Sequence, residues 1–171
     1  MSKSQAVIVE LFKRFRAETE ASQVLSIFSR IKAIYKAEHW RQETLYAFLR
    51  RNVTRERDLW TLLDKKQQQA PYLPQRCNGK RAVIVGAGIS GLQTAMDLKL
   101  QGADVVVVEK RHEFTRHNVV KLWPMSVAYL KSVGVKYFFP SFCCGGLDHI
   151  GIRRLQTCFL KTCLVLGVEV F

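Results

Sequence analysis

Three glycines in the second half of the chain constrain its fold more than any other feature. They form the pattern Gly86-Ala-Gly88-Ile-Ser-Gly91, which comes directly after the short apolar run 81–85. A continuous apolar run of this length is typical of a strand buried on both faces. A second run of this kind occupies 103–109. A strand, a helix and a strand within about thirty residues predict a parallel βαβ unit with a right-handed crossover.

The segment between the two runs has helical periodicity. We expect a helix over 86–101 that ends at Gly102, since glycine is the usual residue just past a helix end. Its inner face should carry Leu92, Ala95, Met96 and Leu100.

This arrangement predicts a dinucleotide-binding site. Gly86 permits a tight turn, Gly88 lets a pyrophosphate approach the backbone, and Gly91 lets the helix pack closely on the strand. The pyrophosphate then lies at the helix N-terminus, where free N–H groups and the helix dipole favour negative charge. Glu109 stands 18 residues after Gly91 and should accept hydrogen bonds from the ribose hydroxyls. An acid there disfavours a 2′-phosphate, so the site should take FAD or NAD. An incidental glycine-rich turn would not explain Glu109.

Basic residues follow this acid. They are Lys110 and Arg111, and then the run Arg116-His117-Asn118, with Trp123 further on. The glycine pattern does not separate FAD from NAD, but these side chains suit the adenine and phosphates of an extended FAD. Taken alone, Lys110 and Arg111 would be read as a solvated surface pair.

The amino-terminal region has a different character. From 7 to 66 the pattern is helical, without glycine or proline. One amphipathic helix should bury Val24, Leu25, Ile27, Phe28, Ile31 and Ile34. A second should run through Trp40, Leu45, Tyr46, Phe48 and Leu49. A third should begin near Thr54 as its N-cap and bury Leu59, Trp60, Leu62 and Leu63.

Prolines, a glycine and a glutamine run over 67–80 predict a connector. We therefore divide the chain into a helical segment 1–66, a linker 67–80, and the first part of a Rossmann-like FAD-binding domain, 81–171. The fold class is α/β: a βαβ unit with an incomplete parallel sheet, preceded by an all-helical segment.

The last third should contain two more helices and a strand. We expect a helix over 124–132 that exits at Gly134, and a helix over 149–166 with Asp148 as its N-cap and Gly167 as its end. The inward residues of the second helix should be Ile152, Leu155, Phe159, Leu160 and Cys163. A third strand should begin at Val168, and the chain stops within it.

Composition narrows the function classes. No apolar run approaches the length of a membrane span, and the start lacks a secretory leader, so we expect no membrane insertion. The five cysteines are an odd number without a C-x-x-C pair, which predicts reduced thiols and no metal site. The net charge of +13 favours polyanionic partners: nucleic acid, acidic membrane or an acidic protein filament. Charge alone does not choose among them.

No catalytic residue can be assigned from the sequence. His149 follows Asp148, but neighbours at a helix start rarely face each other, so capping and surface placement are the preferred reading. Cys143 and Cys144 precede Gly145 and Gly146, which favours a tight turn with small buried thiols over a redox pair. Trp40 and Trp60 should lie in the core.

The stretches GAGISGL, GADVVVVEKRHEFTRHNVVKLWP, LDHIGIRRLQ and LKTCLVLGVEVF closely resemble the flavin monooxygenase domain of the MICAL family. The resemblance implies an FAD enzyme that uses NADPH and O₂ to oxidise methionines of F-actin and so disassembles filaments. It also implies a cytoplasmic, cytoskeleton-associated protein with F-actin, not nucleic acid, as partner. Carried over by position, the FAD contacts are Gly86, Gly88, Ser90, Gly91, Glu109, Lys110, Arg111, Arg116, His117 and Asn118, with Trp123 near the flavin. The family's loop has Pro-Cys where this chain has Ile89-Ser90; serine can still donate and accept a hydrogen bond.

Family members continue with the segments that enclose the flavin, and calponin-homology and LIM domains usually follow. We therefore expect this chain to hold the ADP half of an FAD site. Two other readings stay open: a catalytically inactive fragment or isoform with residual nucleotide binding, and an NAD-dependent Rossmann dehydrogenase.

Overall fold

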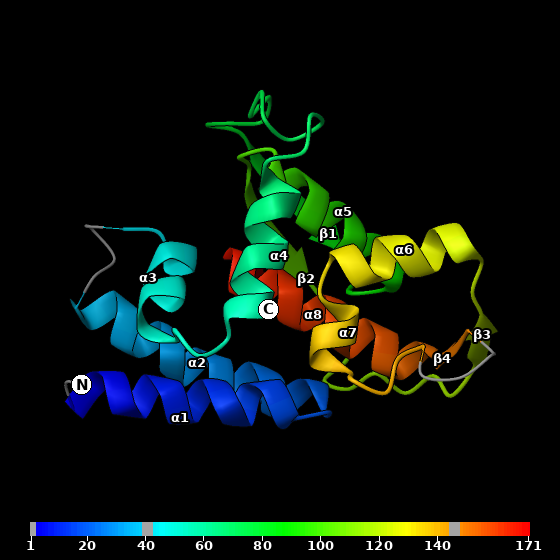
Figure 1. Cartoon of the computed structure of the whole chain (residues 1–171), viewed down its shortest axis with the longest axis horizontal. Helices are drawn as coiled ribbons and strands as arrows, with labels where there is room; N and C mark the ends of the chain where they lie inside the picture. Colours follow the sequence, from blue (N-terminus) through cyan, green and yellow to red (C-terminus); the bar gives the residue numbers. More distant parts are fainter. Residues whose placement is uncertain (1–2, 39–42, 144–147) are drawn as a thin grey trace.

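The computed structural model describes residues 3–38, 43–143 and 148–171. Its amino-terminal part is helical, as expected (Figure 1). The helices are α1 (Lys3–Ala17), α2 (Ala21–Glu38), α3 (Leu45–Asn52) and α4 (Arg57–Gln67). The long helices α1 and α2 pack side by side along one edge of the molecule. Of the two tryptophans predicted to be in the core, Trp60 is buried, and Trp40 lies outside the described residues.

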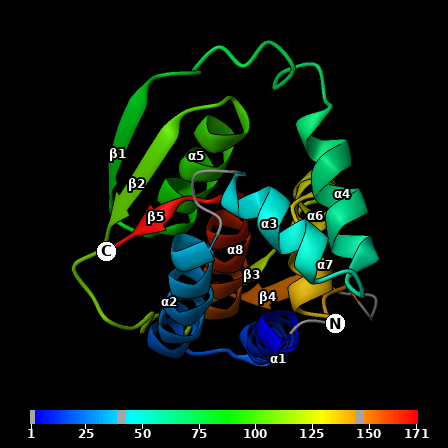
Figure 2. The same ribbon diagram turned by 90° about the vertical axis from the view of Figure 1, so that its left-hand side faces the viewer.

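The βαβ unit is confirmed. Strand β1 (Arg81–Val85) leads through α5 (Ile89–Leu100) into β2 (Asp104–Val108), and the two strands pair in parallel. Strand β5 (Glu169–Val170) adds to the other side of β2, also in parallel, which gives the order β1-β2-β5 (Figure 2). The four predicted inner residues of α5 are buried. Gly102 has a φ of +92° just past the helix, as its predicted role as a stop requires.

Between β2 and β5 the chain forms a second, smaller sheet and three helices. They are β3 (Val119–Lys121), α6 (Pro124–Ser132), α7 (Val135–Phe138), β4 (His149–Gly151) and α8 (Ile152–Leu166). The bounds of α6 are those predicted, and Gly134 and Gly167 both adopt the left-handed conformation. Helix α8 is buried along nearly its whole length and contacts α2, α3, α5 and α7. It is the central element of the fold.

Three predicted helix starts are wrong. Helix α5 begins at Ile89 and not at Gly86, whose φ of +99° is not helical. Asp148 does not cap a helix, because His149–Gly151 is strand β4, paired antiparallel with β3, and α8 begins only at Ile152. The backbone carbonyl of Asp148 accepts a hydrogen bond from the N–H of Leu122 and so extends this pairing. Thr54 lies in a turn, and α4 begins at Arg57. The indole N–H of Trp60 donates to the carbonyl of Val53 at 2.7 Å, which holds this turn against the helix.

The prediction that β1 is buried on both faces is also wrong. Helices α5 and α8 pack beside each other, and α5 contacts both β1 and β2. On the other face Val83 and Val85 are 68% and 88% exposed. They pair in register with Val106 and Val108, and Val108 is 43% exposed as well. The apolar run marked a strand correctly, but only one of its faces is covered by the described residues.

Candidate nucleotide-binding site

The glycine loop has the geometry that a bound pyrophosphate needs. Gly86 has a φ of +99°, which favours glycine, and its N–H donates to the carbonyl of Val108 at 2.7 Å. A Cβ atom on Gly91 would lie 2.2 Å from the carbonyl oxygen of Gly86, so only glycine lets α5 pack this closely on the loop. A Cβ atom on Gly88 would meet nothing within 4 Å. The space in front of Gly88 is therefore open to a ligand.

Glu109 is fixed beside this loop at the carboxyl end of β2. Its two carboxylate oxygens accept hydrogen bonds from the backbone N–H of Ala87 at 2.7 Å and of Arg111 at 2.9 Å. Partial burial acts to raise the pKa of Glu109, but the N–H donors of Arg111, Ala87 and Lys110, together with the positive charge of Arg111, outweigh it and hold the pKa below its usual value. The side chain is therefore a carboxylate at neutral pH, able to accept further hydrogen bonds.

A cleft of about 310 Å³ lies at this point, where the carboxyl ends of β1 and β2 meet α5 and α8. It brings together five of the predicted residues: Gly88, Ser90, Glu109, Arg111 and Arg116. Gly86 and Gly91 shape the loop behind the cleft without lining it. The amino-terminal end of α5 lines it directly, and no acidic side chain occupies the first turn of that helix. The cleft therefore offers a helix N-terminus and two guanidinium groups to an anion.

Besides Gly86 and Gly91, four of the predicted residues do not line this cleft. Lys110 is exposed, and Asn118 is exposed with its backbone carbonyl accepting a hydrogen bond from the N–H of Ile152. Trp123 stands at the N-cap position of α6, makes no side-chain hydrogen bond to that helix, and is 78% exposed. His117 lines a neighbouring cavity instead. Their predicted contacts with a cofactor stay predictions.

The structure adds cleft residues that the sequence reading missed. Gln156 on α8 lines the cleft and donates from its side-chain amide to the carbonyl of Ala87 at 3.2 Å. Glu113 also lines it; one carboxylate oxygen accepts a hydrogen bond from the hydroxyl of Ser22 on α2. A weak signal for Gln156 existed, because it stands four residues after Ile152 on the predicted helix. No local pattern pointed to Ser22, which is 91 residues away from Glu113.

The second carboxylate oxygen of Glu113, Oε2, is buried without a hydrogen-bond partner among the described residues. A buried acceptor of this kind is costly unless a donor reaches it. Glu109 and Glu113 thus give the cleft two carboxylates that suit ribose hydroxyls, while Arg111, Arg116 and the helix end suit phosphates. The residues present therefore fit the adenosine diphosphate part of a dinucleotide.

The described histidines and cysteines do not line this cleft. Within residues 3–38, 43–143 and 148–171, no three His, Cys, Asp or Glu side chains come together as a metal site. The cysteines in that part of the chain, at 77, 143, 158 and 163, are free thiols, and burial raises the pKa of Cys158 to about 11. Cys144, Gly145 and Gly146 lie outside the described residues. His149 is an exposed residue of β4, so its surface placement is confirmed. Among the described helices, none has the length and apolarity needed to cross a membrane.

Fold and cleft together define a partial Rossmann-like dinucleotide-binding unit, preceded by a helical segment. Comparison with known families agrees: residues 81–121 match the family described as FAD dependent oxidoreductase. These residues contain the whole βαβ unit and the basic segment after Glu109.

Individual relatives indicate a narrower family than this match does. The chain is 48% identical over 120 residues to the [F-actin]-monooxygenase MICAL1 of Bos taurus. The aligned residues cover 70% of this chain and 11% of the relative. It is 39% identical over 163 residues to MICAL3 of Homo sapiens, 94% of this chain and 8% of the relative. It is 37% identical over 169 residues to MICAL2 of Mus musculus, and this alignment covers 97% of this chain and 9% of the relative. The predicted kinship with the MICAL F-actin monooxygenases is confirmed. The chain spans about a tenth of the length of these relatives.

Proposed function

We propose that this chain binds the adenosine diphosphate part of FAD and belongs to an FAD-dependent monooxygenase that uses NADPH to oxidise methionines of F-actin. The observation that carries the proposal is the juxtaposition at the carboxyl ends of β1 and β2. There the open face of Gly88, the helix end behind it and the carboxylate of Glu109 share one cleft. The F-actin monooxygenase names of the relatives support the substrate.

Each cleft residue has a distinct task in this proposal. The N–H groups at the start of α5, with Ser90 beside them, bind the pyrophosphate, which the guanidinium groups of Arg111 and Arg116 help to neutralise. Glu109 and the free oxygen of Glu113 accept hydrogen bonds from the ribose and adenine. When bound, FAD supplies the redox chemistry, taking hydride from NADPH and activating O₂. Methionine oxidation then converts the thioether sulfur to the sulfoxide.

The charge of the chain supports the proposed partner. A net charge of +13 raises the rate of encounter with an acidic filament such as F-actin, and this attraction weakens as salt is added. Two alternatives are less well supported. An NAD-dependent dehydrogenase would not account for the F-actin monooxygenase relatives, and an inactive nucleotide-binding form would differ from our proposal only in activity.

Titration of the 171-residue chain with ADP and with FAD tests the binding part. The described cleft serves the ADP part alone, so we expect both ligands to bind with similar, modest affinity. We also expect the chain by itself neither to retain FAD stoichiometrically nor to oxidise NADPH with F-actin present. A protein extended to the length of its relatives should do both. FAD binding far tighter than ADP binding, or NADPH oxidation by the short chain, would show that the flavin is enclosed by these residues after all.

A further inference from the structure

A second cavity, of about 280 Å³, lies next to the dinucleotide cleft and shares Arg116 with it. Its walls come from the turn between α1 and α2, the segment before β3, and the start of α8. The side chains that define its charge are Arg116, His117, Arg153, Arg154 and one carboxylate, Glu20. Three guanidinium groups face one carboxylate, and one of the three, Arg116, is shared with the dinucleotide cleft. The cavity therefore has an excess of positive charge.

Little within the molecule offsets this excess. Arg153 pairs with Glu20. Among the described residues, Arg116 and Arg154 form no ion pair, and Arg154 lies over the ring of Phe139 at 5.1 Å. Arg153 and Arg154 also occupy the first turn of α8, where the helix dipole is positive, and no acidic residue stands in that turn. Positive side chains repel the positive end of the helix dipole, so a bound anion would stabilise this arrangement.

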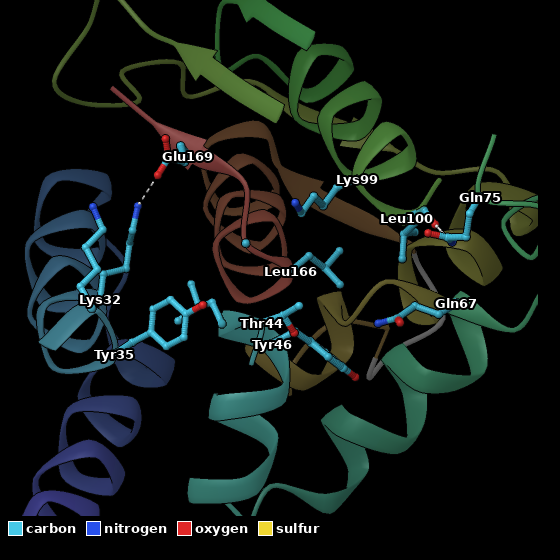
Figure 3. A pocket seen from close by; sticks show the side chains of 13 residues that line it. Lys32, Tyr35, Thr44, Tyr46, Gln67, Gln75, Lys99, Leu100, Leu166 and Glu169 are labelled. Atoms are coloured by element: carbon cyan, nitrogen blue, oxygen red, sulfur yellow. Dashed lines mark hydrogen bonds and ion pairs between the residues drawn. The ribbon is translucent and has the colours of Figure 1, made fainter. Parts of the chain in front are cut away.

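Another cavity with the same formal charge makes the contrast clear. The cavity of about 390 Å³ drawn in Figure 3 is lined by Lys32, Lys36, Lys99 and one carboxylate, Glu169. There Lys32 pairs with Glu169 at 3.2 Å, and Lys99 pairs with Asp104 at 3.6 Å. Leu100 and Leu166, the last residues of α5 and α8, also line it, and helix C-termini favour cations. Two of the three lysines in that cavity are therefore paired with carboxylates of the protein, whereas only one of the three arginines at the start of α8 is.

We propose that the cavity at the start of α8 binds a phosphate monoester, and that its ligand is the 2′-phosphate of NADPH. Arginine is the side chain best suited to a phosphate, because its planar fork donates two parallel hydrogen bonds. The carboxylate of Glu109 disfavours a 2′-phosphate in the first cleft, so that group needs a cationic site of its own. This inference rests on the proposed use of NADPH, and it adds the residues that distinguish NADPH from NADH.

The test is amide NMR of the ¹⁵N-labelled 171-residue chain, titrated separately with inorganic phosphate, 2′,5′-ADP and 5′-ADP. We expect 2′,5′-ADP to shift the amides of Gly151, Arg153 and Arg154 at lower concentration than inorganic phosphate does. We expect 5′-ADP to shift the amides of Gly88 to Ser90 instead. Inorganic phosphate binding as tightly as 2′,5′-ADP would overturn the nucleotide assignment. Absence of shifts at the start of α8 with every ligand would overturn the site. Loss of the Gly88 to Ser90 response alone would instead count against the first cleft.

Three variants, one of them a control, extend the test. Arg154→Gln should weaken 2′,5′-ADP at the α8 site by about tenfold, whereas Arg30→Gln, an exposed arginine of α2, should leave it unchanged. Glu20→Gln removes the carboxylate that competes for Arg153 and should tighten binding several-fold. A merely structural role for these residues would not predict a gain. Equal affinities in Arg154→Gln, Glu20→Gln and the parent chain would refute the proposal.

Discussion

Replacement of single glycines in the nucleotide loop by alanine should separate folding from binding. Gly88 and Gly91 stand three residues apart, yet an added methyl group meets opposite surroundings. At Gly91 it would lie 2.2 Å from the backbone oxygen of Gly86, and the loop would have to move by roughly 0.8 Å to reach the 3.0 Å that real Cβ contacts hardly ever undercut. At Gly88 it would project into open space.

The expected magnitudes differ accordingly. Overpacking costs about 1–3 kcal/mol, and the upper end applies to Gly91→Ala because both clashing groups belong to the backbone. The better helix propensity of alanine returns at most about 1 kcal/mol, so we expect a loss of about 2 kcal/mol in the free energy of unfolding. Gly88 has a φ of −67°, which alanine adopts freely, and losing glycine as N-cap costs only about 0.5–1 kcal/mol. Its methyl group, however, occupies the space where the phosphate approaches.

Urea unfolding followed by circular dichroism, paired with ADP titration, measures both quantities on each variant. Gly88→Ala should fold nearly as well as the parent chain but bind ADP at least about tenfold more weakly, a change of 1.4 kcal/mol. Gly91→Ala should shift the urea midpoint downward. If Gly88→Ala binds ADP like the parent chain, no phosphate lies against that glycine. If Gly91→Ala is as stable as the parent chain, the contact between α5 and the loop is looser than its geometry implies.

Three further changes have defined outcomes. Glu109→Ala should weaken ADP binding by about 1.5–3 kcal/mol for each charge-assisted hydrogen bond lost, while Asp104→Ala, at the far end of the same strand, should leave titration curves unchanged. Burial lowers the pKa of Lys161 from its usual 10.5 to about 8. Between these pH values the unfolded chain binds more protons than the folded chain does. The free energy of unfolding should therefore rise with pH, by up to about 3 kcal/mol. Lys161→Met should flatten this rise in urea titrations; parallel pH profiles of the two proteins would refute the buried charge. Ser22→Ala removes the hydrogen bond to Glu113 and should change the affinity for ADP. If the variant and the parent chain gave identical ADP binding isotherms, this hydrogen bond would not position Glu113 in the cleft.

The parts of the fold that the sequence predicted well are those set by local chemistry. Gly102, Gly134 and Gly167 end helices because each takes a φ near +90°, a conformation that other residues rarely adopt. The glycine loop and Glu109 were found because strand, loop, helix and acid follow one another within about thirty residues. The predicted residues that line the cleft all follow directly after β1 or β2, so they could be found without knowledge of distant contacts.

The errors came from contacts between distant segments. The strand β4 has only three residues, and its partner β3 precedes it by about thirty, so His149-Ile150-Gly151 looked like the first turn of α8. Likewise, hydrophobicity marks β1 as a strand but does not say which element covers each face, and Val85 is exposed. Gln156 reaches the cleft, and Ser22 contacts its residue Glu113, through tertiary packing, which a local pattern does not encode.

Packing also joins the three predicted parts of the chain. Within the predicted linker, the hydroxyl of Tyr72 donates to Asp97 at 2.8 Å, which holds the connector against α5. From the helical segment, the carbonyls of Arg16 and Glu18 accept hydrogen bonds at 2.7 and 2.6 Å from the ammonium group of Lys161 on α8, whose side chain is buried. Without α1 and the turn that follows it, that charge would lose both acceptors, and a buried charge without partners is among the costliest defects a fold can contain. Because α8 also carries Gln156 to the nucleotide loop, we infer that α1 and α2 stabilise the cleft even though they contribute no phosphate-binding group.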